Sequence, residues 1–356
     1  MLKRLLTKFL PLLVGAMVIA IGITQFTTSQ AATTFSYAVT DLGTLGGDKS
    51  VAYDLNDSAQ AVGYSTVNIG SRTNAVLWSN GTLTDLKQFS GIPYNYAVAI
   101  NNAGQVVCNI SPASHVSGRI PYIWQNGNVT NIFQSNQSGY ATAINNVGQV
   151  VGWDVSLSAF IWQNGSTTYL NSLGDNTSNN NDRASDINNK GQIVGYASTN
   201  NGNQLHAVLW ENNTVTDLGT LPGGSNSEAL GINKASTVVG WSETSSGIKH
   251  AVSWQNNQIT DLGTFDGNAT KATDINNRAT IVGYSFTVNN YSNEVPLHAF
   301  VSRNGRMVDL NNLLAANSGW ELNVAHAINN RGQIAGSGQK DGQTRAFLLT
   351  PVRVTR

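Results

Sequence analysis

Short apolar segments alternate with polar turns along almost the whole chain, in a repeating order of four. The first has the form Ala-x-x-Ile/Leu-Asn and runs into an Asn/Gly turn, as at residues 184–191. The second is rich in β-branched residues (192–196), the third often ends in tryptophan (207–210), and the fourth ends in Thr-Asp-Leu (216–218). β-Branched residues favour strands, and Asn and Gly tolerate the positive φ of tight hairpins. Because no window shows sustained helical periodicity, the sequence predicts an all-β protein.

The first segment occurs seven times, and its last residue marks the period. The asparagines are spaced by 45, 44, 43, 45, 43 and 53 residues. Such a fixed period is typical of solenoids, propellers and other repeat arrays. The seven positions are Asn56, Asn101, Asn145, Asn188, Asn233, Asn276 and Asn329.

The two ends of the repeat array are offset by one strand. The fourth strand follows each of the first six units, whereas the chain ends soon after the third strand of unit seven. Residues 37–42, near the other end, have the sequence of the missing strand. A ring uses this offset, because the N-terminal strand completes the last blade and leaves no open seam. We therefore predict a seven-bladed β-propeller of four-stranded antiparallel blades, closed by the N-terminal strand.

Residues 1–31 have the features of a secretory signal peptide. Lys3, Arg4 and Lys8 precede an apolar run over residues 12–23, and Ser29-Gln30-Ala31 is a small-x-small cleavage signal. An uncleaved anchor helix is the alternative, but Pro11 interrupts the run and polar residues follow it. We expect a secreted, extracellular or periplasmic bacterial protein, with no membrane insertion after cleavage and with residues 32–356 forming one propeller domain.

Composition limits the classes of partner. Without residues 1–31 the chain keeps 17 basic and 20 acidic residues, a formal charge of −3. This balance gives no electrostatic reason to expect nucleic acid as a partner. The single cysteine, Cys108, excludes an internal disulfide, and a cysteine in a slot that is glycine in other units favours a buried, inert thiol. We expect a monomer without a cofactor.

Three linked motifs resemble the bacterial HAF-repeat family of probable extracellular proteins. They are the Ala-x-x-Ile-Asn-Asn-x-Gly-Gln-Val-Val-Gly segment, the His-Ala-Phe-like third strand at residues 206–208, 250–252 and 298–300, and Asp-Leu-Gly-Thr-Leu-Gly-Gly at residues 41–47. The resemblance covers essentially the whole mature chain. It implies a secreted or surface-displayed protein with a propeller-like fold, and it supplies no catalytic residues. Unit five departs from the glycine turn, and unit two has Ile-Pro-Tyr in its third strand.

One face of the predicted ring carries the variable loops. The loops at residues 65–74, 109–120, 285–298 and 311–323 differ in length and composition, whereas the turns on the other face are short and nearly identical. On the second strand, the residue after glycine is aromatic in five units, near the start of these loops. Aromatic rings stack on sugars and on peptide side chains, although they also pack between blades. The candidate binding residues are Tyr64, Trp153, Tyr196, Trp241 and Tyr284, together with Trp320 in the loop before unit seven.

Other recurring polar residues are better explained as structural. The segment at residues 186–191 faintly resembles a calcium loop, but it lacks the closing glutamate, and a hairpin turn is the better interpretation. The fourth-strand aspartates Asp41, Asp85, Asp217, Asp261 and Asp309 are expected to cap backbone N–H groups. His206, His250 and His298 occupy one repeat slot, which scatters them around a ring and favours a hydrogen-bonding role. We predict no metal site, and expect the tryptophans Trp78, Trp124, Trp162, Trp210 and Trp254 in the core.

The leading hypothesis is a non-catalytic scaffold that binds a glycan or a protein on its variable-loop face. An extracellular hydrolase or lyase with an asymmetric site at the channel is the first alternative, because propellers do host such sites. Its candidate residues are Asp175, Asp182, Glu228, Asp266, Asn317, Trp320 and Glu321. A structural envelope or matrix component without a discrete ligand is the second alternative.

Overall fold

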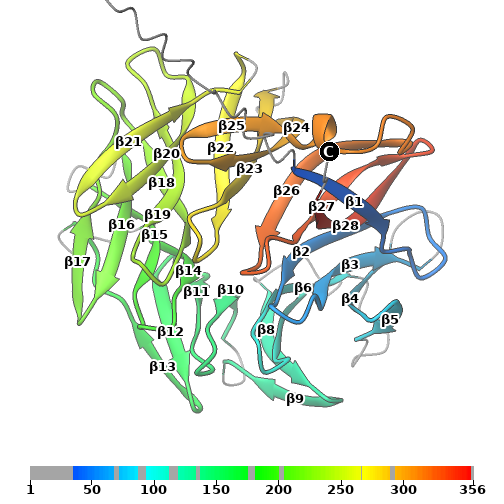
Figure 1. Cartoon of the computed structure of the whole chain (residues 1–356). Helices are drawn as coiled ribbons and strands as arrows, with labels where there is room; N and C mark the ends of the chain where they lie inside the picture. Colours follow the sequence, from blue (N-terminus) through cyan, green and yellow to red (C-terminus); the bar gives the residue numbers. More distant parts are fainter. Residues whose placement is uncertain are drawn as a thin grey trace, which may run out of the picture.

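The computed structural model is a ring of small antiparallel sheets around a central channel (Figure 1). It describes residues 35–67, 72–86, 94–111, 119–133, 137–174, 181–199, 204–265, 267–288 and 293–353. The predicted signal peptide, together with Asp175 and Asp266, lies outside the described residues. No helix in the described part of the chain is both long and apolar enough to span a bilayer.

The described strands form seven four-stranded units, of which the first two are joined into one sheet by a single parallel bridge between Thr73 and Tyr94. Unit 1 contains β2 (Ser50–Leu55), β3 (Ala61–Thr66), β4 (Thr73–Ser79) and β5 (Thr82–Asp85); unit 2 contains β6 (Tyr94–Ile100), β7 (Val106–Ser111), β8 (Ile120–Gln125) and β9 (Asn128–Asn131). Unit 3 contains β10 (Gly139–Ile144), β11 (Val150–Asp154), β12 (Ala159–Gln163) and β13 (Ser166–Tyr169); unit 4 contains β14 (Arg183–Ile187), β15 (Ile193–Ser198), β16 (Leu205–Glu211) and β17 (Thr214–Asp217).

The remaining units follow the same order from the channel outward. Unit 5 contains β18 (Ser227–Ile232), β19 (Val238–Glu243), β20 (Lys249–Gln255) and β21 (Gln258–Gly263). Unit 6 contains β22 (Ala269–Ile275), β23 (Ile281–Val288), β24 (Glu294–Arg303) and β25 (Arg306–Asp309), and a short 3₁₀ helix, η1 (Leu310–Leu313), leads to unit 7. Unit 7 contains β26 (Trp320–Ile328), β27 (Ile334–Lys340), β28 (Gln343–Arg353) and, from the other end of the chain, β1 (Phe35–Asp41).

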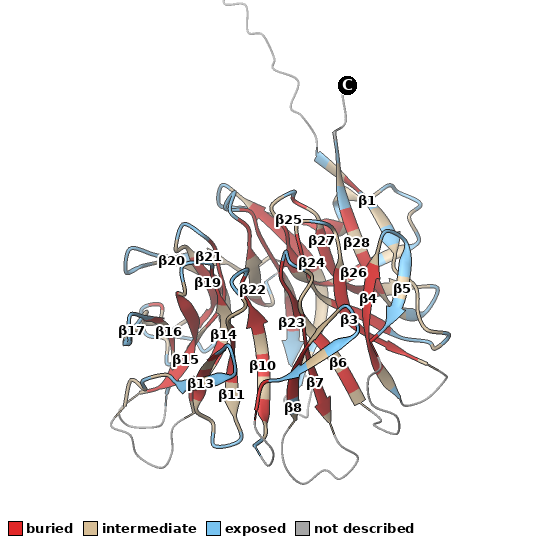
Figure 2. Cartoon of the chain, turned by 90° about the horizontal axis from the view of Figure 1, so that it is seen from below, coloured by how far each residue is buried: buried red, intermediate tan, exposed pale blue. Residues whose placement is uncertain are grey.

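The N-terminal strand completes the last blade, as predicted. β1 pairs antiparallel with β28 from Phe35 opposite Arg353 to Asp41 opposite Phe347 (Figures 1 and 2). Tyr37 is only 4% exposed, within a cluster shared by units 6 and 7. The predicted all-β propeller of four-stranded antiparallel blades, closed by the N-terminal strand, is therefore confirmed.

Buried residues run along the strands of the blades (Figure 2), and the apolar clusters that they form lie between neighbouring blades. Alternate residues of a strand point to opposite faces of its sheet, so each blade packs on both neighbours. On β4, Ala75 and Leu77 join the cluster shared with unit 2, whereas Val76 and Trp78 join the cluster shared with unit 7. The predicted core tryptophans are buried, except that Trp124 is only partly buried.

The repeated asparagines form a closed ring of hydrogen bonds at one end of the channel. In each unit the Asn side-chain Nδ2 donates to the backbone carbonyl of the corresponding Asn in the next unit. The last bond runs from Asn329 back to the carbonyl of Asn56 at 3.0 Å. The other six bonds are 3.0–3.3 Å long and join Asn56, Asn101, Asn145, Asn188, Asn233, Asn276 and Asn329 in chain order.

A second ring, formed by the residue after each of these asparagines, is interrupted at one position. Here the backbone N–H donates to the side-chain Oδ1 of the same position in the next unit, as from Asn146 to Asn189 at 2.8 Å. The equivalent residue in unit 5 is Lys234, which has no acceptor atom. The Asn189 N–H consequently has no hydrogen-bond partner among the described residues.

Removing residues 33–42 should open the last blade. The deletion takes β1 from β28 and Tyr37 from its cluster, which exposes an unpaired strand edge. We expect a lower melting temperature than that of the intact mature chain. Adding a synthetic peptide of residues 35–42 should restore it in a concentration-dependent manner. An unchanged melting temperature would contradict the closure of the ring by β1.

Replacing Lys234 with asparagine should complete the second ring. A hydrogen bond contributes about 0.5–1.5 kcal/mol to stability, and the low end applies at this exposed position. We expect Lys234→Asn to raise the free energy of unfolding by about 0.5 kcal/mol in denaturant titrations. Lys234→Ala is the matched control, because it removes the lysine without adding an acceptor. Equal stabilities of the two variants would argue against the interrupted ring.

Candidate functional site

Each inner strand carries a β-bulge that turns one side chain toward the channel. The register shifts immediately after the repeated alanine in all seven units, as between Ala52 and Asp54 on β2. A bulge inserts an extra residue into one strand and re-aims its side chain. The bulged residues all line one pocket in the channel, and they are Tyr53, Val98, Thr142, Ser185, Leu230, Thr273 and His326.

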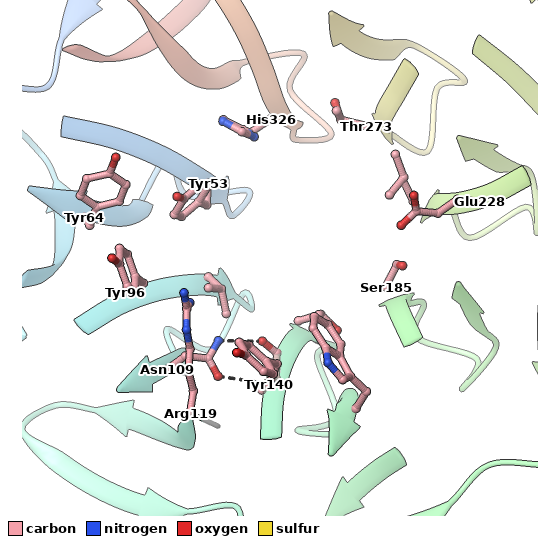
Figure 3. Close-up of a pocket in the computed structure, with 15 residues that line it drawn as sticks. Tyr53, Tyr64, Tyr96, Asn109, Arg119, Tyr140, Ser185, Glu228, Thr273 and His326 are labelled. Carbon is pink, nitrogen blue, oxygen red and sulfur yellow. Dashed lines mark hydrogen bonds between the residues drawn. The ribbon is translucent and has the colours of Figure 1, made fainter. Parts of the chain in front are cut away.

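This pocket lies toward the variable-loop end of the channel, opposite the asparagine rings. Its volume is about 650 Å³. Tyrosines from units 1–3 form one wall, whereas Glu228 and Ser185 lie on the opposite side (Figure 3). The tyrosine wall consists of Tyr53, Tyr64, Tyr96 and Tyr140, with Trp153, Asn109 and Arg119 beside them.

The aromatic wall is held together by ring contacts. Tyr140 stacks on Trp153 with centroids 4.8 Å apart and an interplanar angle of 13°. Tyr64 meets the edge of Tyr96 at 5.3 Å, and Tyr53 lies 5.8 Å from Tyr64. Such pairs fix the orientation of each ring and add to the stabilisation from burial.

The phenol groups of this wall are available to a ligand. Within the described residues, the hydroxyls of Tyr53, Tyr64, Tyr96 and Tyr140 make no hydrogen bond, and none is a buried atom lacking a partner. Burial raises the pKa of Tyr64 to about 12 and also raises that of Tyr53. At neutral pH these hydroxyls are therefore protonated and can both donate and accept hydrogen bonds.

The predicted binding residues divide into two groups. Tyr64 and Trp153 line the pocket. Trp153, Tyr196 and Trp241 line an adjoining hollow of about 270 Å³, which shares Trp153, Ser185 and Glu228 with the pocket. Tyr284 contacts Phe286 instead, and Trp320 packs edge-on against Phe347, so the structure places these two away from both cavities.

Basic side chains cover one face of every predicted aromatic residue. Lys249 lies 4.0 Å from the centroid of Trp241, and Arg183 lies 4.8 Å from that of Trp153 and 5.7 Å from that of Tyr196. Lys49, Lys271 and Lys340 lie over Tyr64, Tyr284 and Trp320 in the same way. These cation–π contacts use one face of each ring, so a ligand reaches only the other face or the edge. Because Tyr140 stacks on Trp153 as well, a ligand meets Trp153 at its edge.

Glu228 is the hydrolase candidate that the structure brings into the pocket. Its Oε2 accepts a hydrogen bond from the Trp241 indole N–H at 2.8 Å, and burial raises its pKa. Burial also lowers the pKa of His326 to about 4, so this histidine is neutral at neutral pH. Asp182 instead accepts from the Ser198 N–H, and Glu321 lies beside Asn323. Paired-carboxylate catalysis requires a second carboxylate, and Glu228 is the one carboxylate among the described residues of this pocket.

The histidine and aspartate repeats form structural pairs between the third and fourth strands. Nδ1 of His206 lies 2.8 Å from Asp217, and equivalent contacts join His250 to Asp261 and His298 to Asp309. The aspartates also cap backbone N–H groups, as Asp217 does for Gly219 at 2.7 Å. In unit 7 the pair is Arg345 with Asp41 of β1, which ties the chain ends together.

Cys108 is fully buried on β7, and burial raises the pKa of its thiol to about 12. The predicted burial of this thiol is therefore confirmed. At the glycines that occupy its slot in other units, an added Cβ would collide with the inner strand; at Gly63 it would lie 1.9 Å from the carbonyl oxygen of Val51. This close approach explains why glycine precedes the aromatic residue on the second strand.

Sequence reasoning missed Tyr53, Tyr96, Tyr140 and Arg119. The search followed residue types that recur, whereas the pocket is built where the repeat varies. The residue after the first-strand alanine is Tyr, Val, Thr, Ser, Leu, Thr and His in successive units. Such variation within an otherwise uniform strand is the signal that could have identified the channel wall.

Three buried aspartates clamp neighbouring blades between the pocket and the asparagine rings. Asp274 accepts from the N–H of Ile275 at 2.6 Å and from the N–H of Ile328 in the next unit at 2.7 Å. Asp54 and Asp186 make the same pair of bonds in units 1 and 4. Burial raises the pKa of all three, and mutual repulsion adds to the effect for Asp54 and Asp274.

The ring of four-stranded antiparallel blades around the channel pocket defines the class of protein, a β-propeller, and the similarity to one solved structure, the first of the three below, agrees with this class. YCF48 bound to a D1 peptide is similar with a TM-score of 0.53 and 11% sequence identity, over 90% of this chain and 96% of that chain. A chain of the mitotic checkpoint complex gives a TM-score of 0.46 and 12% identity, over 98% and 99%. The Aleuria aurantia lectin bound to Fucα1-6GlcNAc gives a TM-score of 0.38 and 9% identity, over 74% and 94%.

At such low identity the similarity to YCF48 concerns the fold alone. No family model and no curated protein matches the chain. The resemblance to HAF repeats and the predicted secretion therefore stay predictions.

The aspartate clamps should make stability depend on pH. Burial and repulsion raise the pKa of Asp274 from 3.8 to about 7 in the folded protein. Between these pH values the folded chain retains a proton that the unfolded chain releases, so the stability due to Asp274 falls as pH rises through this range. We expect the wild type to lose stability relative to Asp274→Asn between about pH 4 and about pH 7 in denaturant titrations.

Asp57 provides a control, because the pKa of its carboxyl group is shifted in the opposite direction to that of Asp274. Hydrogen bonds from Asn330 and Asn102 lower the pKa of this carboxyl group. Its contribution is present above the ordinary aspartate pKa and is lost only as pH falls through the lowered one. The difference between wild type and Asp57→Asn should therefore not decrease between about pH 4 and about pH 7. A pH-independent difference for Asp274→Asn would contradict the assignment.

Proposed function

We propose that this protein is a non-catalytic binding scaffold that holds a glycan in the aromatic pocket at the variable-loop end of its channel. One observation carries the proposal: four tyrosine hydroxyls without a hydrogen-bond partner in the described residues converge on a single pocket. Sugar hydroxyls are matched by such donors and acceptors, and the apolar faces of sugar rings are matched by aromatic rings. The pocket volume of about 650 Å³ is in the usual range for ligand sites.

The rigid setting of the pocket supports this function. Its side chains project from inner strands that the asparagine ring and the aspartate clamps hold at fixed positions. A preorganised site loses little conformational entropy when it binds its ligand. The named ligands of YCF48 and of the Aleuria lectin belong to those proteins, so the class of ligand here rests on the pocket itself.

A glycan array and a peptide library probed with the mature chain test the proposal. We expect a glycan signal that Tyr53→Ala combined with Trp153→Ala weakens at least about tenfold, since each lost ring contact costs on the order of 1 kcal/mol. Tyr169→Ala is the matched control, because Tyr169 is 47% exposed on the outer strand β13. A blank glycan array, or binding that survives the double substitution, would refute the proposed site.

A further inference from the structure

Arg119 holds the main uncompensated positive charge in the pocket. Its guanidinium carbon lies 4.8 Å from the ring centroid of Tyr96 and 5.1 Å from that of Tyr140. Its backbone carbonyl accepts a hydrogen bond from Gly139 N–H at 2.8 Å, which fixes the start of β8 to unit 3. Figure 3 shows the side chain extending along the tyrosine wall into the pocket. The planar guanidinium is thus positioned by two neighbouring blades.

At the variable-loop end of the channel, the basic residues of one side form ion pairs with carboxylates, whereas those of the other side do not. Lys249 and Lys271 share Glu294, at 3.6 and 2.7 Å, and Lys340 pairs with Asp41 at 3.3 Å. Among the described residues, neither Arg119 nor Arg183 has a carboxylate within 4.0 Å. Lys49, which lies over Tyr64 in unit 1, likewise has no carboxylate within 4.0 Å among these residues. The unpaired positive charge therefore lies on the side of units 1–4, beside the tyrosine wall.

The carboxyl group of the pocket lies on the opposite side. Glu228 faces the tyrosine wall across the channel (Figure 3). Its carboxylate is held by Trp241, and Lys271 and Lys249 act on it electrostatically. An anionic group in the pocket is consequently attracted to the Arg119 guanidinium on the tyrosine side.

We propose that the ligand is an acidic oligosaccharide, with a uronate carboxylate held by the Arg119 guanidinium. This rests on the proposed function, and it adds the chemical class of the sugar. The fork of N–H donors on arginine matches a carboxylate in a bidentate arrangement, while the tyrosine hydroxyls meet the sugar hydroxyls. The adjoining hollow at Arg183, Tyr196 and Trp241 extends the site to a second sugar residue.

Calorimetric titration with two probes tests the proposal. The acidic probe is a trigalacturonate, and the neutral probe is the same trisaccharide with its carboxyl groups reduced to alcohols. We expect the wild type to bind the acidic probe at least about tenfold more tightly, because a hydrogen bond between two charged groups is stronger than one between neutral groups. Raising the salt concentration should reduce this preference. Equal affinity for both probes would overturn the proposal and leave the glycan-binding function intact.

Substitutions test whether Arg119 causes the preference for the acidic probe. Arg119→Gln should abolish the preference for the acidic probe, measured as the ratio of the affinities of the same variant for the two probes. Arg119→Lys keeps the charge but loses the fork, and should retain part of the preference. Arg278→Gln, at an exposed turn beside the asparagine ring, removes the same charge far from the pocket and should change nothing. A preference that survives Arg119→Gln would overturn the assignment to Arg119.

Failure of the proposed glycan-binding function gives a different experimental result from failure of the acidic-ligand proposal. If neither trisaccharide binds and an acidic peptide from the library binds with a requirement for Arg119, the ligand is a protein and both glycan proposals are wrong. Because the comparison of the two probes uses wild-type protein, it remains informative even if a variant fails to fold. Thermal melting of each variant identifies that case.

Discussion

The closed ring of asparagine hydrogen bonds is the constraint on which the rest of the molecule depends. Each ring asparagine uses nearly all of its hydrogen-bonding capacity. Asn145 donates to Asn188 and to the Gln149 side chain, and it accepts from the N–H groups of residues 147 and 149. The same side chain thus shapes its own turn and fixes the distance to the next blade. Because the last bond joins Asn329 to Asn56, the number of units and the diameter of the channel are set together.

Because the asparagine ring fixes the blades at one end of the channel, the residues at the opposite end can vary. The turns beside the ring must keep one conformation, and units that lack glycine there still adopt it: Ser236 has φ 63° and Ala279 has φ 56°. A non-glycine residue at such a positive φ costs on the order of 1 kcal/mol. Two backbone N–H groups of the turn donate to the side chain of the ring asparagine, and these hydrogen bonds offset the cost. At the opposite end, the bulged residue contributes its side chain to the channel without taking part in the ring. Its identity can therefore change from unit to unit while the scaffold stays the same.

The sequence predicted the scaffold well because the scaffold is what repeats. The period, the offset of the ends and the caps at Asp217 and its counterparts follow from local hydrogen bonding and strand patterning. The pocket could be predicted only in part. Tyr64 and Trp153 were identified from a recurring aromatic position, but Tyr284 occupies the same position and contacts Phe286 instead. Arg119 lies outside any repeated motif, and its place between Tyr96 and Tyr140 depends on how two blades meet, which no single unit encodes.

The asymmetry of the pocket arises from substitutions at equivalent positions of a nearly symmetric frame. On the first strand of each unit, one residue precedes the repeated alanine. It lies opposite the residue that follows the glycine (Cys108 in unit 2) on the second strand, so these two residues form a cross-strand pair whose identity differs between units. In unit 3 this pair is Tyr140 with Trp153, a stacked pair, and in unit 5 it is Glu228 with Trp241, a hydrogen-bonded pair. Equivalent backbone positions thus present ring faces and hydroxyls on one side of the channel and a carboxyl group on the other. A ligand that enters such a pocket is oriented by charge before any of its hydroxyls is recognised, because electrostatic attraction acts over longer distances than hydrogen bonds do.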